Sequence, residues 1–209
     1  MLLEVSENVS MLEYHLFLGP MAPQFAFQGR SVIVVPSSGV DARILKNVGK
    51  SYGATEDEFN RFIRIIEAKS YMPIEKLPYV IAVEGKDWRE DLSKVLKVEE
   101  ELRAETGKSN LSIVGLDTLI TLYGERICEK ILNLIATIAR KVEAIVVAIV
   151  KAGRRDLAIR LSPIADVYLR LIREHGCLLV YGVKPRTSLY AVEIDTSKGY
   201  PLSKLTPIV

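Results

Sequence analysis

Two groups of charged side chains in this sequence are candidates for a functional site, because each lies at the end of an apolar run. Asp117 lies near the end of an apolar run at 111–119. Lys151 and Arg154 directly follow a second apolar run, at 144–150. Open α/β sheets bind ligands at the carboxyl ends of parallel strands, so the carboxylate is a candidate for chemistry and the cations could pair with phosphate. Structural roles are the alternatives: the carboxylate could cap the following turn, and the basic loop could be solvated.

The two apolar runs are expected to be strands of one sheet. They are rich in Ile and Val and are joined by a helical stretch at 124–140. Continuous β-branched runs joined by a helix are typical of a parallel sheet covered on both faces, because each strand must then be apolar on both sides. The sequence therefore predicts a βαβ unit at the core of an α/β protein.

The rest of the chain adds strands and helices before this unit and short strands after it. Asp41 and Thr55 are predicted to cap helices, and Thr55 forms a capping box with Glu58. The last short runs suit an antiparallel hairpin and meander, with 188–195 as an exposed edge strand and a short tail after it. The predicted strands are 14–18, 31–35, 79–84, 166–173, 177–183 and 188–195, and the further helices are 42–52, 56–67 and 87–106.

Composition limits the classes of function. The 209 residues suit a single domain, 1–209, and a formal charge of +2 without a basic tract does not predict strong non-specific DNA binding. Two cysteines and two histidines without Cys-x-x-Cys spacing argue against a metal centre, and Cys128 and Cys177 are expected to be buried. An acidic start and apolar runs far shorter than the ~18 residues of a membrane span predict a soluble, cytoplasmic protein.

Three stretches together resemble the RecA-type ATPase core of archaeal and bacterial KaiC-like and RadA-like proteins, over roughly 14–200. The run at 111–119 resembles the Walker B strand, which ends in an acid that orients magnesium, here Asp117. The segment 162–171 resembles a serine, two residues, an alanine and an aspartate that lead into an apolar strand. The segment 181–194 resembles a Lys-x-Arg segment that leads into a strand. This resemblance implies a RecA-like three-layer α/β/α sandwich, with a mostly parallel central sheet and an antiparallel hairpin or meander at one edge.

The same resemblance implies roles for the cations. In ring-forming relatives, the positions of Lys184 and Arg186 face the nucleotide of a neighbouring subunit, where an arginine stabilises charge on the transferred phosphate. Pro185 is expected to fix an extended backbone that sends these two side chains to opposite sides; a basic turn between edge strands is the alternative. The region of Lys151 and Arg154 corresponds to a polar nucleotide sensor or to a loop that faces nucleic acid.

Two requirements of ATP hydrolysis are unmet where the family places them. A P-loop reads Gly-x-x-x-x-Gly-Lys-Ser/Thr, because backbone N–H groups, a lysine and a hydroxyl hold phosphate and magnesium. The corresponding stretch, 19–27, keeps Gly19 as a nucleotide-site candidate but has no lysine or hydroxyl, and Pro20 and Pro23 each remove a backbone donor. The predicted second strand, 31–35, is followed by no acid that could activate water.

The leading hypothesis is therefore a KaiC-like or RadA-like paralogue that has lost ATP hydrolysis and acts as a regulatory or assembly partner through protein–protein interaction. Its partner would be a second copy or an active RecA-family paralogue, and no cofactor or membrane is expected. The alternative is an ATP-binding or ATP-hydrolysing recombination or repair enzyme, in which ATP and magnesium use Asp117 with Lys151, Arg154 or a neighbour's Lys184 and Arg186. Single-stranded DNA binding ranks lower, because the tyrosines are scattered and charge supports no basic groove.

Overall fold

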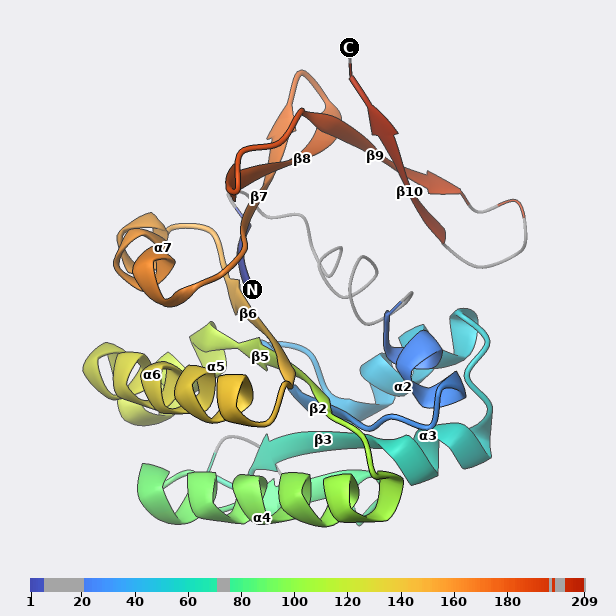
Figure 1. Ribbon diagram of the computed structural model, residues 1–209, viewed down its shortest axis with the longest axis vertical. Coiled ribbons are helices and arrows are strands. Elements are labelled where there is room, and N and C mark those ends of the chain that lie inside the picture. Colours follow the sequence, from blue (N-terminus) through green and yellow to red (C-terminus); the bar gives the residue numbers. More distant parts are fainter. Residues whose placement is uncertain (6–20, 71–75, 196, 198–201, 209) are drawn as a thin grey trace.

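The computed structural model describes residues 1–5, 21–70, 76–195, 197 and 202–208. A ten-stranded sheet passes through the protein in the order β10-β9-β8-β7-β1-β6-β5-β2-β3-β4 (Figure 1). Its strands are β1 (Leu2–Val5), β2 (Val32–Val35), β3 (Ile63–Ala68), β4 (Val80–Val83), β5 (Leu111–Gly115), β6 (Ile145–Val150), β7 (Tyr168–Glu174), β8 (Cys177–Lys184), β9 (Tyr190–Asp195) and β10 (Leu202–Pro207). The helices are α2 (Ala42–Ser51), α3 (Glu56–Phe62), α4 (Trp88–Thr106), α5 (Leu116–Tyr123), α6 (Glu125–Lys141) and α7 (Arg155–Leu161), with a 3-10 turn η1 (Ser162–Ile164). Residues 21–27 are also helical.

The sheet has a parallel part and an antiparallel part. From β7 to β4 in this order, each strand runs parallel to its neighbours. Strands β8, β9 and β10 continue the sheet beyond β7 in antiparallel pairs, at the end of the molecule remote from α4 (Figure 1). Although β1 opens the chain, it lies between β6 and β7, with Leu3 opposite both Ile149 and Leu169.

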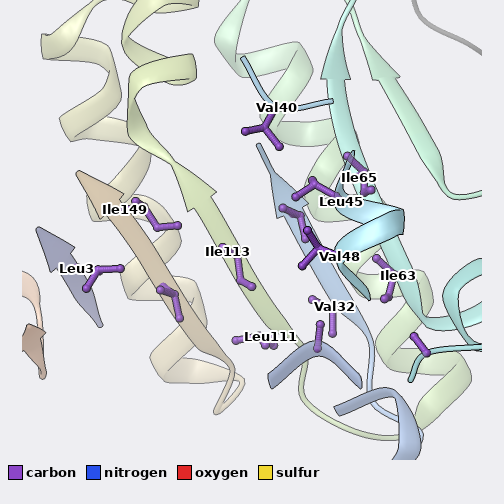
Figure 2. Close-up of a cluster of buried hydrophobic side chains, with 14 of the residues drawn as sticks. Leu3, Val32, Val40, Leu45, Val48, Ile63, Ile65, Leu111, Ile113 and Ile149 are labelled. Atoms are coloured by element: carbon purple, nitrogen blue, oxygen red, sulfur yellow. The ribbon is translucent and has the colours of Figure 1, made fainter. Parts of the chain in front are cut away.

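One face of the parallel strands packs against α2, α3 and the helix at 21–27. Successive strand residues point to opposite faces, so alternate positions of each strand enter this core. Figure 2 shows part of the resulting layer of buried hydrophobic side chains. The layer includes Leu3, Val32, Val34, Ile63, Ile65, Leu111, Ile113, Val147 and Ile149 from the strands and Leu45, Val48 and Phe59 from the helices.

The other face packs against α4, α5, α6 and α7. Val114 and Val150 contact a cluster that contains Leu119, Ile131 and Leu157 from three of these helices. Ile33 and Ile66 pack with Leu102 of α4. Burying such a side chain contributes about 1.5–3 kcal/mol, and the central strands do so on both faces, which explains their continuous apolar sequences. The predicted three-layer α/β/α class, with its antiparallel addition, is confirmed.

Most predicted elements are present, but the helix predicted at 56–67 is wrong in its second half. The capping box of Thr55 and Glu58 begins α3 as expected, yet α3 ends at Phe62 and β3 begins at Ile63. Because the segment 63–68 is short, its apolar residues fit the helical period of 3.6 residues and the strand period of 2 equally well. Pairing with both β2 and β4 makes the segment a strand, and this pairing depends on residues distant in the sequence.

Besides β3, strands β1 and β10 were not predicted, and one exposed edge was assigned wrongly. The predicted first strand, 14–18, lies outside the described residues, whereas β1 is formed by Leu2–Val5. The predicted edge strand corresponds to β9, which is covered by β10, so the edge of the sheet is one strand further along the chain. Pro207 at the end of β10 lies opposite Tyr190, a position that an edge strand tolerates.

The two cysteines differ in their surroundings. Cys128 is buried as expected, and desolvation raises the pKa of its thiol to about 12. Cys177 is exposed, so the expectation that both are buried is wrong; it begins β8 beside the turn of a hairpin, away from the core. Among the described residues, no helix is long and apolar enough to span a membrane.

Candidate functional site

Asp117 lies at the carboxyl edge of the parallel strands, but in a helix rather than in a strand. Strand β5 ends at Gly115, and Asp117 stands in the first turn of α5. Its Oδ2 accepts a hydrogen bond of 2.8 Å from the backbone N–H of Ser38, in the loop after β2. Its Oδ1 is buried and has no hydrogen-bond partner within the described part of the chain. Asp117 therefore holds a neighbouring loop and keeps one acceptor unused.

The loop after β2 is fixed to the start of α5 by two further contacts. Thr118 Oγ1 donates to the carbonyl of Pro36 over 2.6 Å. A Cβ on Gly115 would lie 2.6 Å from the backbone nitrogen of Ser37, which real Cβ atoms do not approach so closely. Glycine is required here because the two backbones pass in close contact.

A buried glutamate that the sequence did not single out completes this edge. Glu67 in β3 is 8% exposed, and its Oε1 accepts a hydrogen bond of 2.8 Å from the N–H of Ala42, the first residue of α2. Asp41 caps the same helix by accepting from Ile44 N–H over 2.8 Å. A cavity of about 20 Å³ lies between Glu67 and Thr118, room for about one water molecule. The carboxylates of Glu67 and Asp41 therefore accept hydrogen bonds from backbone N–H groups.

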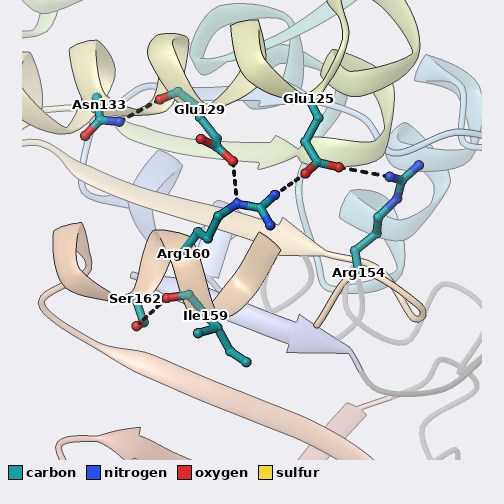
Figure 3. Close-up of polar contacts among 7 residues, drawn as sticks. All are labelled: Glu125, Glu129, Asn133, Arg154, Ile159, Arg160 and Ser162. Carbon is teal, nitrogen blue, oxygen red and sulfur yellow. Dashed lines mark hydrogen bonds and ion pairs between the residues drawn. The ribbon is translucent and has the colours of Figure 1, made fainter. Parts of the chain in front are cut away.

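The basic loop after β6 is tied to α6. Arg154 precedes α7, and its Nη1 lies 3.1 Å from Oε2 of Glu125 (Figure 3). Arg160, six residues further on in α7, pairs with Glu125 and with Glu129, the latter at 2.8 Å. Lys151 directly follows β6 at the same edge as Asp117. Of the two cations predicted to face phosphate, Arg154 is thus engaged by a carboxylate of its own chain.

Lys184 and Arg186 lie away from Asp117. Lys184 pairs with Tyr168, the first residue of β7, so it marks the amino edge of the parallel strands. Its Nζ donates to the carbonyl of Ala165 over 2.6 Å. Arg186 pairs with Val183 in an isolated antiparallel bridge, so the chain reverses here and the expected extended backbone is wrong. Gly19 lies outside the described residues.

The structure adds a polar network that sequence reasoning missed. Glu4 in β1 is 3% exposed; it accepts a hydrogen bond from the Tyr168 hydroxyl and forms an ion pair with Arg170, whose Nη2 lies 3.1 Å from Glu4 Oε1. Arg170 also donates to the Tyr181 hydroxyl over 2.9 Å. Burial and, secondly, the bond to Glu4 raise the pKa of Tyr168. No local pattern could reveal this network, because its members come from opposite ends of the chain.

The carboxyl edge does not fit a magnesium site built by the protein alone. Magnesium takes six oxygen ligands in near-octahedral geometry and commonly uses one or two carboxylates with phosphate and water. Asp117 Oδ1 could supply one oxygen. Within the described ranges, however, no group of three or more His, Cys, Asp or Glu residues could hold a metal ion.

Comparison with known proteins identifies the fold. No protein-family model and no curated protein matches the sequence. A KaiC-like protein from the hyperthermophilic archaeon Pyrococcus horikoshii has a similar structure, with a TM-score of 0.64 and 13% identity over 97% of this chain and 88% of that chain. An uncharacterised protein of the same organism, crystallised in complex with an unknown peptide, has a TM-score of 0.71 and 12% identity over 98% of this chain and 91% of that chain. At such identities the likeness shows the fold alone, which is KaiC-like and RecA-type.

Proposed function

We propose that this chain, whose fold is RecA-type and KaiC-like, is a non-hydrolysing paralogue that acts as a regulatory or assembly partner through protein–protein interaction. Its partner is a second copy or an active RecA-family protein. Fold alone does not fix function, so the proposal rests on the side chains at the edge where relatives of this fold would hold nucleotide.

The proposal rests on the hydrogen bonds that Asp117 and its neighbour form. This acid, to which the resemblance assigns magnesium, accepts the N–H of Ser38 at 2.8 Å. The adjacent Thr118 binds the carbonyl of Pro36, so the loop after β2 is held against α5 from two sides. A carboxylate used in this way contributes to the fold rather than to the positioning of a metal ion.

The cations support the same conclusion. Phosphoryl transfer depends almost wholly on positioning and on charge stabilisation, so it needs cations that are available to phosphate. Arg154 is bound to Glu125, and Lys184 is bound to the carbonyl of Ala165. The sequence contains no Gly-x-x-x-x-Gly-Lys-Ser/Thr segment.

We propose that the partner binds to the antiparallel strands, which expose apolar side chains. Ile194 of β9 and Leu205 of β10 are 40% and 54% exposed, and Val183 of β8 is 38% exposed. Strand β10 is an edge of the sheet, where unpaired backbone groups can pair with another chain. The similar protein from P. horikoshii was crystallised with an unknown peptide, and our proposal extends peptide or protein binding to this chain.

Size-exclusion chromatography with light scattering tests this proposal. We expect concentration-dependent association of the purified protein, or a stable complex with an active RecA-family paralogue. Leu205→Asp should weaken that association, whereas Ile159→Asp, on α7 and equally 54% exposed, should leave it unchanged. A monomer at every concentration and with every paralogue tested would contradict the proposal.

ATP binding is the second candidate, and the buried Oδ1 of Asp117 favours it. An acceptor with no partner among the described residues is costly, and a magnesium ion carried by ATP would satisfy it. Release of phosphate from ATP by the wild-type protein, lost in Asp117→Ala, would establish this function in place of the first.

A further inference from the structure

A cavity of about 310 Å³ opens at the amino edge of the parallel strands, away from Asp117. Its floor is formed by the first residues of β1 and β6, including Leu2 and Val146. The C-terminal half of α6 forms one wall, and the end of α7 with the η1 turn forms the other. Apart from Arg140, Asp166 and Met1, every residue of its lining is aliphatic, and it contains no aromatic ring. The N-terminal ammonium of Met1 donates to the carbonyl of Val146 over 2.7 Å.

The shape of the cavity follows from the lengths of two helices. Helix α7 has 7 residues and α6 has 17, so α7 covers the sheet beside only part of α6. Where both helices are present, Arg154 and Arg160 bind Glu125 and Glu129 and close the space between them (Figure 3). Beyond that point α6 presents Ala136 to the gap, and so small a side chain leaves the apolar floor uncovered.

The rim of the cavity carries a guanidinium with unused donors. Arg140 Nη2 donates to the carbonyl of Ile164 over 2.6 Å and to Oδ1 of Asp166 over 3.0 Å. Its Nη1 and Nε have no such partner in the ranges that the structure describes. A second cation, Lys184, binds the carbonyl of the lining residue Ala165. Arg140 first, then the N-terminal ammonium and Lys184 more weakly, hold the pKa of Asp166 below its usual range. These three cations outnumber the one carboxylate at the rim, so its net charge is positive.

We propose that this cavity binds a medium-chain aliphatic carboxylate, with its alkyl chain on the floor of β1 and β6 and its carboxylate on Arg140. Small-molecule sites usually enclose about 300–1,000 Å³ and combine an apolar lining with a few polar groups that fix orientation. Charge-assisted hydrogen bonds from a guanidinium to a carboxylate are strong, and Nη1 and Nε of Arg140 can each donate one. The lack of aromatic rings favours a flexible alkyl chain over a planar ligand. This site is independent of the function proposed above.

Isothermal titration of the full chain with decanoate, decanol and decylammonium, each below its micellar concentration, tests both parts of the site. We expect decanoate to bind at least tenfold more tightly than decanol, and decylammonium to bind most weakly because of the positive rim. Absence of decanoate binding, or equal affinity for the three head groups, would overturn the proposal.

Two variants locate the binding. Ala136→Phe fills the cavity and should abolish decanoate binding, whereas Thr137→Phe, the next residue on α6 and outside the lining, should retain it. Arg140→Gln should lower decanoate affinity to that of decanol and leave decanol unchanged; its side chain is 51% exposed, so the fold should tolerate the change. Decanoate binding that persists in a folded Ala136→Phe protein, or that ignores Arg140→Gln, would place the ligand elsewhere and refute the site.

Discussion

Glu4 shows how a single residue can bind distant parts of this chain together. Its carboxylate lies in a central strand with 3% exposure, and burying an ion in this way costs several kcal/mol unless partners replace water. Tyr168 and Arg170 of β7 supply those partners. The pKa of Tyr168 is raised, so its hydroxyl stays protonated and continues to donate. The network fastens β1 to the strand that begins the antiparallel part.

Replacing Glu4 should therefore be costly. In Glu4→Ala the guanidinium of Arg170, whose side chain is 19% exposed, loses its carboxylate, and we expect the free energy of unfolding to fall by about 3–5 kcal/mol. Urea denaturation of both proteins measures this difference. Glu84→Ala is the matched control, because the pair of Glu84 with Lys69 is exposed on both sides and should matter little. Equal stability of the two variants would contradict the role of the network.

At the scale of elements, Glu56 joins α2 to α3. It begins α3, and its carboxylate binds Lys46 and, at 2.7 Å, Lys50 of α2. These hydrogen bonds lower the pKa of Glu56 from 4.5 to about 2. Because the pKa is lower in the folded state, the stabilisation is present above about pH 4.5 and is lost as the pH falls towards about 2.

We expect this loss to appear in a comparison of wild type with Glu56→Gln. The wild-type protein should have the higher urea midpoint at pH 6, and the gap should shrink on acidification towards about pH 2, as Glu56 becomes protonated. The effect should be modest, because the pair is half exposed and screened by solvent. A gap that stays constant or widens with acid would exclude this ion pair as its cause.

The junction of β5 with α5 should be sensitive to one added methyl group. Gly115→Ala places a Cβ against the backbone of Ser37, so the loop after β2 must move and its bond to Asp117 must weaken. We expect a loss of about 1–3 kcal/mol in unfolding free energy, with faster hydrogen exchange at the Ser38 amide. Thr121→Ala, on the exposed side of the same helix, should change neither quantity. Normal protection of the Ser38 amide in Gly115→Ala would show that the contact is dispensable.

The sequence predicted elements well where the signals were local. The apolar run before Asp117, the Asp41 cap and the capping box at Thr55 all depend on residues within a few positions of each other, and all are present. Strands β1 and β3 were missed because their partners lie far along the chain. The glutamate inside β1 makes its four residues look unlike a core strand until Arg170 is placed beside it.

The site could be predicted only in part, because only some of its features depend on residues that are close in the sequence. Asp117 was placed correctly at the carboxyl edge, because the end of a buried strand can be read from the sequence. That Ser38 would bind it, or that Lys184 would lie at the opposite edge, follows from sheet order and register alone. The cavity beside Arg140 depends on the relative lengths of α6 and α7, and no local pattern contains that relation.

The whole molecule presents two edges of one parallel sheet with different chemistry. At the carboxyl edge, the carboxylates that could hold a ligand accept backbone N–H groups: Asp117 binds Ser38, and Glu67 binds the start of α2. At the amino edge, an apolar cavity remains open beside Arg140. Beyond both, β10 ends the sheet with an exposed strand. This distribution is the basis of our proposal that the chain acts through its surfaces.

Calorimetric titration of the purified protein with ATP and ADP, with and without magnesium, tests the central claim most directly. We expect no heat of binding and no phosphate release from protein that unfolds cooperatively, because Asp117 and Glu67 bind backbone N–H groups and Arg154 binds Glu125. Magnesium-dependent micromolar binding that disappears in Asp117→Ala would contradict this claim, and would mean that the chain binds nucleotide through an unusual phosphate site.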